Sequence, residues 1–385
     1  MDIDGVLIRG VAQILPTKEG LAKLMAKKKI TLYQGFDPTG TQLHIGHAVA
    51  LRKLRQFQDL GHHVIFLIGD GTGQAGDPSG KKQTREKFFT NQELRENAKG
   101  YVMQASKIVR FDGENPVEIL YNGDWLNKLK LVDILTIAQN FSVQQLIERD
   151  MFQERIKKNE SINLREFLYP LLQGYDSVAM KVDLELGGTD QTFNMLAGRT
   201  LVKSFLNKEK FVMSVPLLTD SKGVKIGKSE GNVIALTDKP IDFYAKIMAL
   251  GDDAIVNCFT LLTDRSVSEI KEIGREINKG SAMKYKKQLA FDLTTWLNSK
   301  KDAEDAQENF EKTFQKREPE YGDTVENKNN LIDTLESILG SKSEAKRLIK
   351  QGGVDINGEK ITDVNFELKQ GDKINLGKRR FLKVK

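Results

Sequence analysis

The sequence predicts an α/β protein in which a doubly wound parallel sheet is followed by an all-helical region and a small C-terminal α+β domain. Short apolar segments alternate with helical periodicity over roughly the first 220 residues, as in α/β proteins. From about residue 238 to 316 only helical spacing is found, and the pattern changes again beyond a polar segment. A chain of 385 residues is also long enough for two or three domains.

Strands of the first sheet are expected at residues 30–36, 64–68, 117–121 and 182–186. The first alternates apolar and polar residues and ends at the turn Asp37-Pro38-Thr39-Gly40. The second is a continuous apolar run, which is typical of a strand buried on both faces of a parallel sheet. Helical spacing after His47 places a helix between these two strands. The succession of strand, helix and strand predicts a Rossmann-like sheet.

The rest of the chain divides into shorter units. Ser266 and Glu269 form a capping-box pattern ahead of a helix, and residues 316–330 are polar and contain Pro319 and Gly322. In the last segment, helical spacing is followed by a hairpin signal at Asn357-Gly358 and by short strands. We therefore expect an α/β domain at residues 1–225, a helical domain at 226–316, a linker at 317–329 and a small domain at 330–385.

Positive charge is concentrated at the C-terminal end. Residues 341–385 contain twelve Lys or Arg and six Asp or Glu, a net charge of +6 that equals the net charge of the whole chain. The body is therefore close to neutral, and the basic tail suggests a module that binds a polyanion such as a nucleic acid. A solvated lysine-rich tail explains the charge equally well.

Composition excludes several classes of protein. No run of eighteen apolar residues is found and the N-terminus lacks a signal-peptide pattern, so we expect neither a membrane span nor secretion. Cys258 is the only cysteine, which rules out an internal disulfide and a thiolate metal cage. A reducing cytoplasm is the expected compartment.

The segment His44-Ile45-Gly46-His47 stands where a strand and its turn meet a helix. Helix N-termini bind phosphates through free N–H groups and a partial positive charge. Two imidazoles three residues apart lie on one helical face, where they could stabilise charge on a phosphorus in a transition state. A metal site is not expected, because no cysteine is near and the spacing is not that of a zinc helix.

The segment Lys225-Ile226-Gly227-Lys228-Ser229 follows a turn-rich stretch. Two lysines around a glycine suit a loop that closes on a leaving pyrophosphate, although Lys-Gly-Lys loops are also common at solvated surfaces. The spacing of a P-loop is missing. Taken together, the histidine and lysine motifs resemble the two signature motifs of class I aminoacyl-tRNA synthetases, with Ile226 and Gly227 replacing the residues most often found at the middle of the second.

Further segments resemble bacterial tyrosyl-tRNA synthetases over nearly the whole chain. These are Tyr33-Gln34-Gly35-Phe36-Asp37-Pro38-Thr39, Gly76-Asp77-Pro78-Ser79-Gly80-Lys81-Lys82, Tyr169-Pro170-Leu171-Leu172-Gln173-Gly174-Tyr175-Asp176 and Gly187-Gly188-Thr189-Asp190-Gln191. Glu185 departs from the family, in which many members have Gln, and no role is predicted for it. The tail from about residue 330 resembles a small RNA-binding module shared with a ribosomal protein, with a basic stripe at Lys342, Lys346, Arg347 and Lys350.

The resemblance implies a tyrosine site and an ATP site. Tyr33 and Asp176 would pair with the phenol hydroxyl and so reject phenylalanine. The residues implied to bind tyrosine are Tyr33, Asp77, Tyr169, Gln173, Asp176 and Gln191. Those implied to bind ATP are Gly35, Asp37, Gly46, Gly188, Asp190 and Lys228. Those implied to act in catalysis are Thr39, His44, His47, Lys81, Arg85, Lys225, Lys228 and Ser229.

The implied activity is a two-step ligation of tyrosine to its tRNA through a tyrosyl-adenylate. ATP would be a substrate accompanied by Mg²⁺, and no prosthetic group is expected. The resemblance also implies a homodimer with its contact in an insertion near residues 120–160, and a helical domain that contacts tRNA. A tryptophanyl-tRNA synthetase shares the fold and the motifs and remains the nearest alternative; a synthetase-like RNA-binding protein without activation activity is the other.

Overall fold

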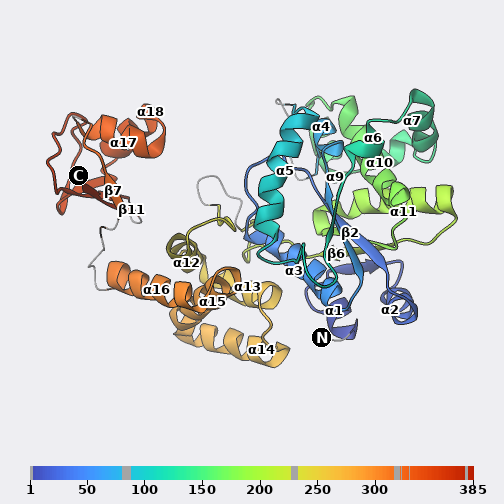
Figure 1. Ribbon diagram of the computed structural model, residues 1–385, viewed down its shortest axis with the longest axis horizontal. Coiled ribbons are helices and arrows are strands. Elements are labelled where there is room, and N and C mark those ends of the chain that lie inside the picture. Colours follow the sequence, from blue (N-terminus) through green and yellow to red (C-terminus); the bar gives the residue numbers. More distant parts are fainter. Residues whose placement is uncertain are drawn as a thin grey trace.

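The computed structural model describes residues 3–79, 88–226, 233–315, 321, 323–328, 330–377 and 380–385. Figure 1 shows a large sheet with helices on both faces, a helical region beside it, and a small C-terminal sheet with its own helices. Within these residues, no helix combines the length and the apolar character that crossing a membrane requires.

The large sheet has six strands in the order β1-β6-β5-β2-β3-β4. Their bounds are β1 Gln13–Leu15, β2 Thr31–Phe36, β3 His63–Ile68, β4 Glu118–Tyr121, β5 Leu184–Gly188 and β6 Phe211–Val215. Strands β2 to β6 run parallel, and in the register Tyr33 lies between Ile65 and Glu185. This confirms the doubly wound α/β fold. Strand β6 and the edge strand β1, which pairs antiparallel with it, had no counterparts among the expected strands.

Helices cover both faces of this sheet (Figure 1). The helices of this part of the chain are α1 Ile3–Ile8, α2 Lys18–Lys27, α3 Ile45–Asp59, α4 Thr72–Ala75, α5 Asn91–Ala105, α6 Gly123–Leu126, α7 Leu131–Ala138, α8 Val143–Ile147, α9 Asp150–Lys157, α10 Leu164–Ala179 and α11 Thr192–Leu206, with the short turn η1 Thr189–Gln191. The chain leaves β2 in one direction toward β3 and β4, and β5 and β6 lie on its other side. Ligands bind at such a switch point, beyond the carboxyl ends of the strands.

The helical region contains α12 Pro240–Met248, η2 Asp252–Ala254, α13 Ile255–Leu262, α14 Val267–Glu276, η3 Ile277–Ser281, α15 Ala282–Leu297, α16 Lys300–Phe310 and η4 Glu311–Gln315. The predicted capping box is present, because the Glu269 N–H donates to Ser266 Oγ at 3.2 Å and the Ser266 N–H donates to Glu269 Oε2 at 2.7 Å. Buried residues of this region join those of the large sheet in one hydrophobic core.

The C-terminal unit has a core of its own. Its elements are β7 Asp323–Val325, α17 Leu331–Leu339, α18 Lys342–Lys350, β8 Val354–Ile356, β9 Glu359–Lys360, β10 Lys373–Leu376 and β11 Arg380–Val384, and the strand order is β7-β11-β10-β8-β9. The predicted turn at Asn357-Gly358 joins β8 to β9, and both residues have positive φ, 55° and 94°. Strand β7 lies inside the segment expected to be a linker, where it pairs parallel with β11.

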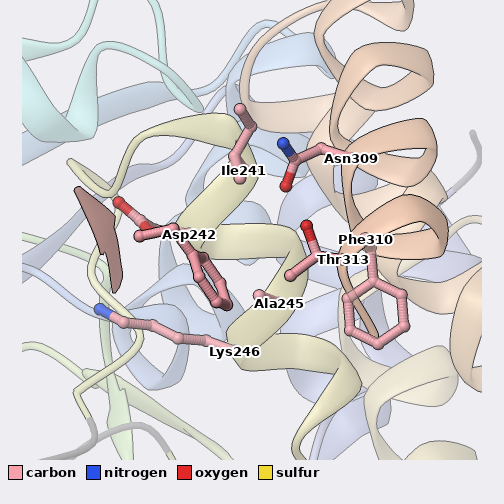
Figure 2. Close-up of a pocket in the computed structure, with 8 residues that line it drawn as sticks. Ile241, Asp242, Ala245, Lys246, Asn309, Phe310 and Thr313 are labelled. Atoms are coloured by element: carbon pink, nitrogen blue, oxygen red, sulfur yellow. The ribbon is translucent and has the colours of Figure 1, made fainter. Parts of the chain in front are cut away.

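A pocket lies between α12 and the end of α16 (Figure 2). It is lined by Ile241, Asp242, Ala245, Lys246, Asn309, Phe310, Thr313 and Phe381. None of these residues belongs to the motifs described above. The candidate active site is therefore described from the contacts of the motif residues and not from this pocket.

Candidate active site

The carboxyl end of β2 carries Asp37, which accepts two hydrogen bonds from distant parts of the chain. Tyr169 of α10 donates its hydroxyl to Asp37 Oδ2 at 2.9 Å, and Thr72 of α4 donates to Oδ1 at 2.7 Å. Burial, followed by the nearby Asp37 and Asp77 carboxylates, raises the pKa of Tyr169 well above its ordinary value. Tyr169 therefore keeps its proton and acts as a hydrogen-bond donor.

Asp77 is held next to this cluster by Gln191, which lies in η1 directly before α11. Gln191 donates its Nε2 to Asp77 Oδ2 at 2.8 Å, and the Ser79 N–H donates to Oδ1 at 2.8 Å. Asn194 fixes the Gln191 amide by donating to its Oε1 at 2.9 Å. Two residues that the sequence predicted to bind tyrosine, 114 positions apart, are thus directly hydrogen-bonded.

The residues expected at the phenol end lie on β2 and α10. Asp176 is buried and accepts hydrogen bonds from Trp125 Nε1 at 2.8 Å and Asn122 Nδ2 at 3.0 Å. Burial raises the pKa of Asp176 well above its ordinary value, while these two hydrogen bonds oppose the rise. Tyr33 is also buried, and its hydroxyl lies 2.9 Å from Ser177 Oγ.

Asn122 and Trp125 were not identified from the sequence. They follow the carboxyl end of β4, and Asn122 also accepts the N–H of Gly71 through its side-chain oxygen at 2.7 Å. Polar residues directly after a strand of a parallel sheet are a known signal for a binding site. That signal was present at Asn122 and could have found it.

Gln173 lies between Tyr169 and Asp176 on α10, as the helical spacing predicted. Its Nε2 donates to Glu185 Oε1 at 2.9 Å. Glu185 is buried in β5 and forms an ion pair with Lys210, which is fully buried just ahead of β6. Glu185, the residue that departs from the family, thus contacts Gln173 of the expected tyrosine site.

The histidine motif begins α3, with His44 as its N-cap. His44 Nδ1 accepts the Gly46 N–H at 3.1 Å, and His47 Nδ1 accepts the His44 N–H at 3.1 Å. The two ring centroids are 3.9 Å apart. Because Nδ1 is an acceptor in both rings, each neutral imidazole carries its proton on Nε2. Each ring therefore donates through Nε2 and not through Nδ1.

The segment after the lysine motif pairs with the histidine motif. The Ile45 N–H donates to Ile234 O at 2.9 Å, and the Leu236 N–H donates to Leu43 O at 2.9 Å. A Cβ atom built on Gly46 would lie 3.7 Å from the carbonyl oxygen of Ile226. The two motifs, about 180 residues apart in sequence, are therefore neighbours in space.

Lys225 connects the lysine motif to the end of β5. Its Nζ lies 2.9 Å from Asp190 Oδ2, and Asp190 follows Gly188 in η1. At the end of β2, the Thr39 N–H donates to Asp37 O at 2.7 Å, and Gly35 is exposed. The predicted residues Lys81, Arg85, Lys228 and Ser229 lie outside the described residues.

Among the residues that the structure describes, no group of three or more His, Cys, Asp or Glu side chains could hold a metal ion. Carboxylate, imidazole and ammonium groups nevertheless converge from β2, α3, α10, η1 and the lysine motif. Such a site can bind an amino acid at one end and phosphates at the other.

Comparison with known proteins agrees with this arrangement. Residues 25–315 match the family described as tRNA synthetases class I (W and Y), and residues 337–374 match the S4 domain. The tyrosine–tRNA ligase of Thermotoga maritima is 41% identical over 98% of this chain and 96% of its own length. That of Aquifex aeolicus is 40% identical over 98% of this chain and 97% of its own.

Solved structures share the fold at lower identity. A truncated mitochondrial tyrosyl-tRNA synthetase of Aspergillus nidulans superposes with a TM-score of 0.67 and 23% identity, covering 81% of this chain and 94% of that one. The tyrosyl-tRNA synthetase of Archaeoglobus fulgidus in complex with L-tyrosine gives a TM-score of 0.62 and 20% identity, covering 80% of this chain and all of that one.

The family match at residues 25–315 covers the tryptophanyl and tyrosyl branches together and does not separate them. The relatives at about 40% identity are named tyrosine–tRNA ligases, so the tryptophanyl alternative is not favoured. The chain belongs to the tyrosyl branch of the class I aminoacyl-tRNA synthetases.

Proposed function

We propose that the chain attaches tyrosine to its cognate tRNA in two steps at the site described above. In the first step the tyrosine carboxylate attacks the α-phosphorus of ATP, which gives tyrosyl-adenylate and pyrophosphate. In the second, a hydroxyl of the terminal ribose of tRNA takes the tyrosyl group and AMP leaves. Neither step needs a covalent enzyme nucleophile, so catalysis comes from positioning and charge stabilisation. The convergence of the two motifs with the α10 cluster is the observation that carries the proposal.

Tyrosine is proposed to lie along α10. Tyr33 and Asp176 bind its phenol hydroxyl, and the hydrogen bonds from Asn122 and Trp125 hold the Asp176 carboxyl group in place. At the other end Asp77, Tyr169 and Gln173 bind the ammonium group, and Gln191 contacts the same region through Asp77. Phenylalanine would leave the buried polar groups at the phenol end without a partner, which costs more than the lost contact.

ATP is proposed to lie across the carboxyl ends of β2 and β5. Gly188 and Asp190 take the ribose, as expected at the switch point of this fold, and Gly35, Asp37 and Gly46 border the nucleotide. His44 and His47 donate from Nε2 to the phosphates, because their Nδ1 atoms are engaged with the backbone.

Cations and hydroxyl groups close the phosphate end of the proposed site. Lys225 is placed there by its ion pair with Asp190, and Thr39 is near through its backbone contact with Asp37. From the family resemblance, Lys81, Arg85, Lys228 and Ser229 complete this group. Mg²⁺ is proposed to arrive with ATP, held mainly by the phosphates, where it neutralises charge.

The domains are proposed to share the work as the sequence suggested. Residues 1–225 bind tyrosine and ATP, the helical domain at 226–316 contacts tRNA, and the basic unit from about 330 binds RNA. Lys346, Arg347 and Lys350 are exposed on α18, as phosphate contacts require. A cytoplasmic location is proposed, since Cys258 is the only cysteine and the chain therefore has no internal disulfide that would need an oxidising compartment.

A homodimer is proposed through the insertion near residues 120–160. Five apolar side chains in and beside it are 60–74% exposed: Leu131, Val132, Leu135, Val143 and Leu164. Monomeric proteins rarely expose so many large apolar residues close together in sequence, and such patches mark interaction sites.

Exchange of labelled pyrophosphate into ATP, measured with each amino acid in turn, tests the proposed function. Tyrosine alone should support rapid exchange, and tRNA should then accept the tyrosyl group. Exchange with tryptophan in place of tyrosine would identify a tryptophanyl enzyme. Binding of tRNA without exchange would identify an RNA-binding protein that does not activate an amino acid.

A further inference from the structure

Glu185 and Lys210 form an ion pair inside the α/β domain. Their side chains are 2% and 0% exposed, and Lys210 also donates to the carbonyl oxygen of Met195 at 3.1 Å. Burial lowers the pKa of Lys210, which the Glu185 carboxylate opposes. Buried ion pairs are often no more stable than apolar residues of the same volume, because two charges lose their hydration. A contribution to stability therefore does not explain why this ion pair is buried here.

Gly198 of α11 leaves room for the Lys210 ammonium group. A Cβ atom on Gly198 of α11 would lie 2.4 Å from Lys210 Nζ and 2.8 Å from Ser177 Oγ. Any side chain at residue 198 would therefore displace the charge that neutralises Glu185. The absence of a side chain at Gly198 thus leaves room for the Lys210 side chain to reach Glu185. Lys210 directly precedes β6.

Glu185 determines which way the Gln173 amide faces. A carboxylate can only accept hydrogen bonds, so the Gln173 Nε2 must face Glu185, at 2.9 Å. The amide oxygen then points away from Glu185. Among the described residues this Gln173 Oε1 is buried and has no hydrogen-bond partner. A buried acceptor without a partner is costly, which favours a ligand N–H group at this position.

A glutamine at residue 185 would not impose that orientation. Its own amide could turn to donate to Gln173, and the Gln173 Nε2 would then face the ligand. An NH₂ group cannot accept a hydrogen bond from an ammonium group. A protonated Glu185 would have the same effect, because a carboxylic acid can donate to the Gln173 oxygen.

We propose that the buried Glu185–Lys210 pair fixes the Gln173 amide as a hydrogen-bond acceptor for the α-ammonium group of tyrosine. Glu185 acts as a positioning residue through Gln173, and Lys210 acts through Glu185 by holding its carboxylate in the buried ion pair. The inference rests on the proposed placement of tyrosine along α10. It assigns a role in substrate selection to a glutamate that the family resemblance left without one.

The test compares Glu185→Gln, Lys210→Met and the double variant in pyrophosphate exchange. Each single substitution should raise the KM for tyrosine roughly tenfold, the usual effect of losing a hydrogen bond to a charged group. The KM for ATP should stay within twofold of wild type. In the double variant the KM for tyrosine should equal that of Glu185→Gln, since Lys210 has no further role once residue 185 is uncharged. Lys208→Met, which removes the partly exposed pair with Asp183, is the matched control and should change neither KM.

A ligand that lacks the amine separates positioning from general damage to the fold. Inhibition of exchange by 3-(4-hydroxyphenyl)propionate should be the same in Glu185→Gln and wild type, whereas inhibition by tyrosinol, which keeps the amine, should be about tenfold weaker. Equal weakening of both inhibitors, or of neither, overturns the inference. Wild-type protein that shows no exchange with tyrosine would instead refute the proposed function. Glu185→Gln is nearly isosteric, so the comparison stands even where Lys210→Met fails to fold.

Discussion

The Lys225 ammonium group lies 2.9 Å from the Asp190 carboxylate, and this ion pair joins the lysine motif to the carboxyl end of β5. The two side chains are 44% and 28% exposed, so the pair contributes little to stability. Its importance is positional, because it places a cation where the nucleotide is proposed to bind.

Replacing Lys225 by Ala should therefore slow chemistry and spare tyrosine binding. We expect adenylate formation at saturating tyrosine and ATP to be about 100-fold slower, the usual effect of removing one group that stabilises transition-state charge. Stopped-flow measurement of the activation step gives this rate directly. Lys222→Ala, in the exposed turn three residues earlier, should behave as wild type. A wild-type rate for Lys225→Ala would remove this lysine from the site.

Tyr33→Phe should weaken the discrimination between tyrosine and phenylalanine. The substitution removes a buried hydroxyl that is 2.9 Å from Ser177 Oγ and is proposed to contact the substrate phenol. The ratio of kcat/KM values in pyrophosphate exchange should fall roughly 10-fold to 100-fold, mainly through loss of activity with tyrosine. Tyr175→Phe is the control, because Tyr175 lies on the same helix as Asp176 but packs against Phe205. An unchanged ratio in Tyr33→Phe would place the phenol elsewhere.

Local patterns explain which parts of this site could be predicted. Tyr169, Gln173 and Asp176 were assigned to one helical face because helical spacing is a property of consecutive residues. The hydrogen bonds from Asn122 and Trp125 to Asp176 span more than 50 positions and depend on how β4 meets α10. Spacing in the sequence carries no information about such contacts, so Trp125 was missed, whereas the place of Asn122 directly after a strand was a signal that was not used.

The fold shows the same limit. Strand β3 was predicted because residues 64–68 form a continuous apolar run, whereas β1 and β7 have three residues each and show no period. Both short strands exist because an edge strand of a completed sheet offers unpaired backbone groups. Lys210 was missed for a related reason. A lone lysine before a strand gives no sign that it is buried, and only the position of Glu185 on the neighbouring strand accounts for it.

Disrupting the exposed apolar patch should produce a monomer. Leu131 and Leu135 are 73% and 60% exposed on one face of α7, and an aspartate at each would place charge in the proposed contact. Light scattering coupled to size-exclusion chromatography should give twice the chain mass for wild type and one chain mass for Leu131→Asp/Leu135→Asp. Val267→Asp, at a residue 61% exposed in the helical region, should leave the mass unchanged. A monomeric wild type would refute the proposed dimer.

His62 should make the protein less stable in mild acid. Its Nδ1 accepts the Ile30 N–H at 3.3 Å, and burial, with a smaller effect of Lys29, lowers the pKa of His62 from 6.5 to about 4. Between these values the unfolded chain binds a proton at His62 that the folded chain does not. The contribution of neutral, buried His62 to the free energy of unfolding is therefore complete above pH 6.5 and is lost as the pH falls toward 4. Urea unfolding at several pH values should show a smaller decline for His62→Asn. His63→Asn, at the exposed neighbour, should retain the steeper decline, and equal slopes in His62→Asn and wild type would contradict the prediction.

Removing the C-terminal unit should separate the two steps of the reaction. The deletion should begin at residue 316, because a cut at 330 would leave β7 without its partner β11 and Tyr321 without its hydrogen bond to Asn375. We expect pyrophosphate exchange within about twofold of wild type, since the unit has its own core and contributes no residue to the proposed active site. Charging of tRNA should fall strongly. Equal losses in both assays would show that the unit supports the catalytic domain itself.

Charge reversal on α18 tests the same role without a deletion. Lys346 and Arg347 are exposed, and neither carries the ion pair that Lys342 makes with Asp333 at 2.7 Å. Lys346→Glu/Arg347→Glu should raise the KM for tRNA about tenfold or more and reduce its dependence on salt, because fewer phosphate contacts release fewer counterions. Lys23→Glu/Lys27→Glu on α2 changes the net charge by the same amount far from α18 and should leave the KM for tRNA nearly unchanged. If both double variants weaken tRNA binding equally, net charge and not the α18 surface is responsible, and the proposed RNA contact is wrong.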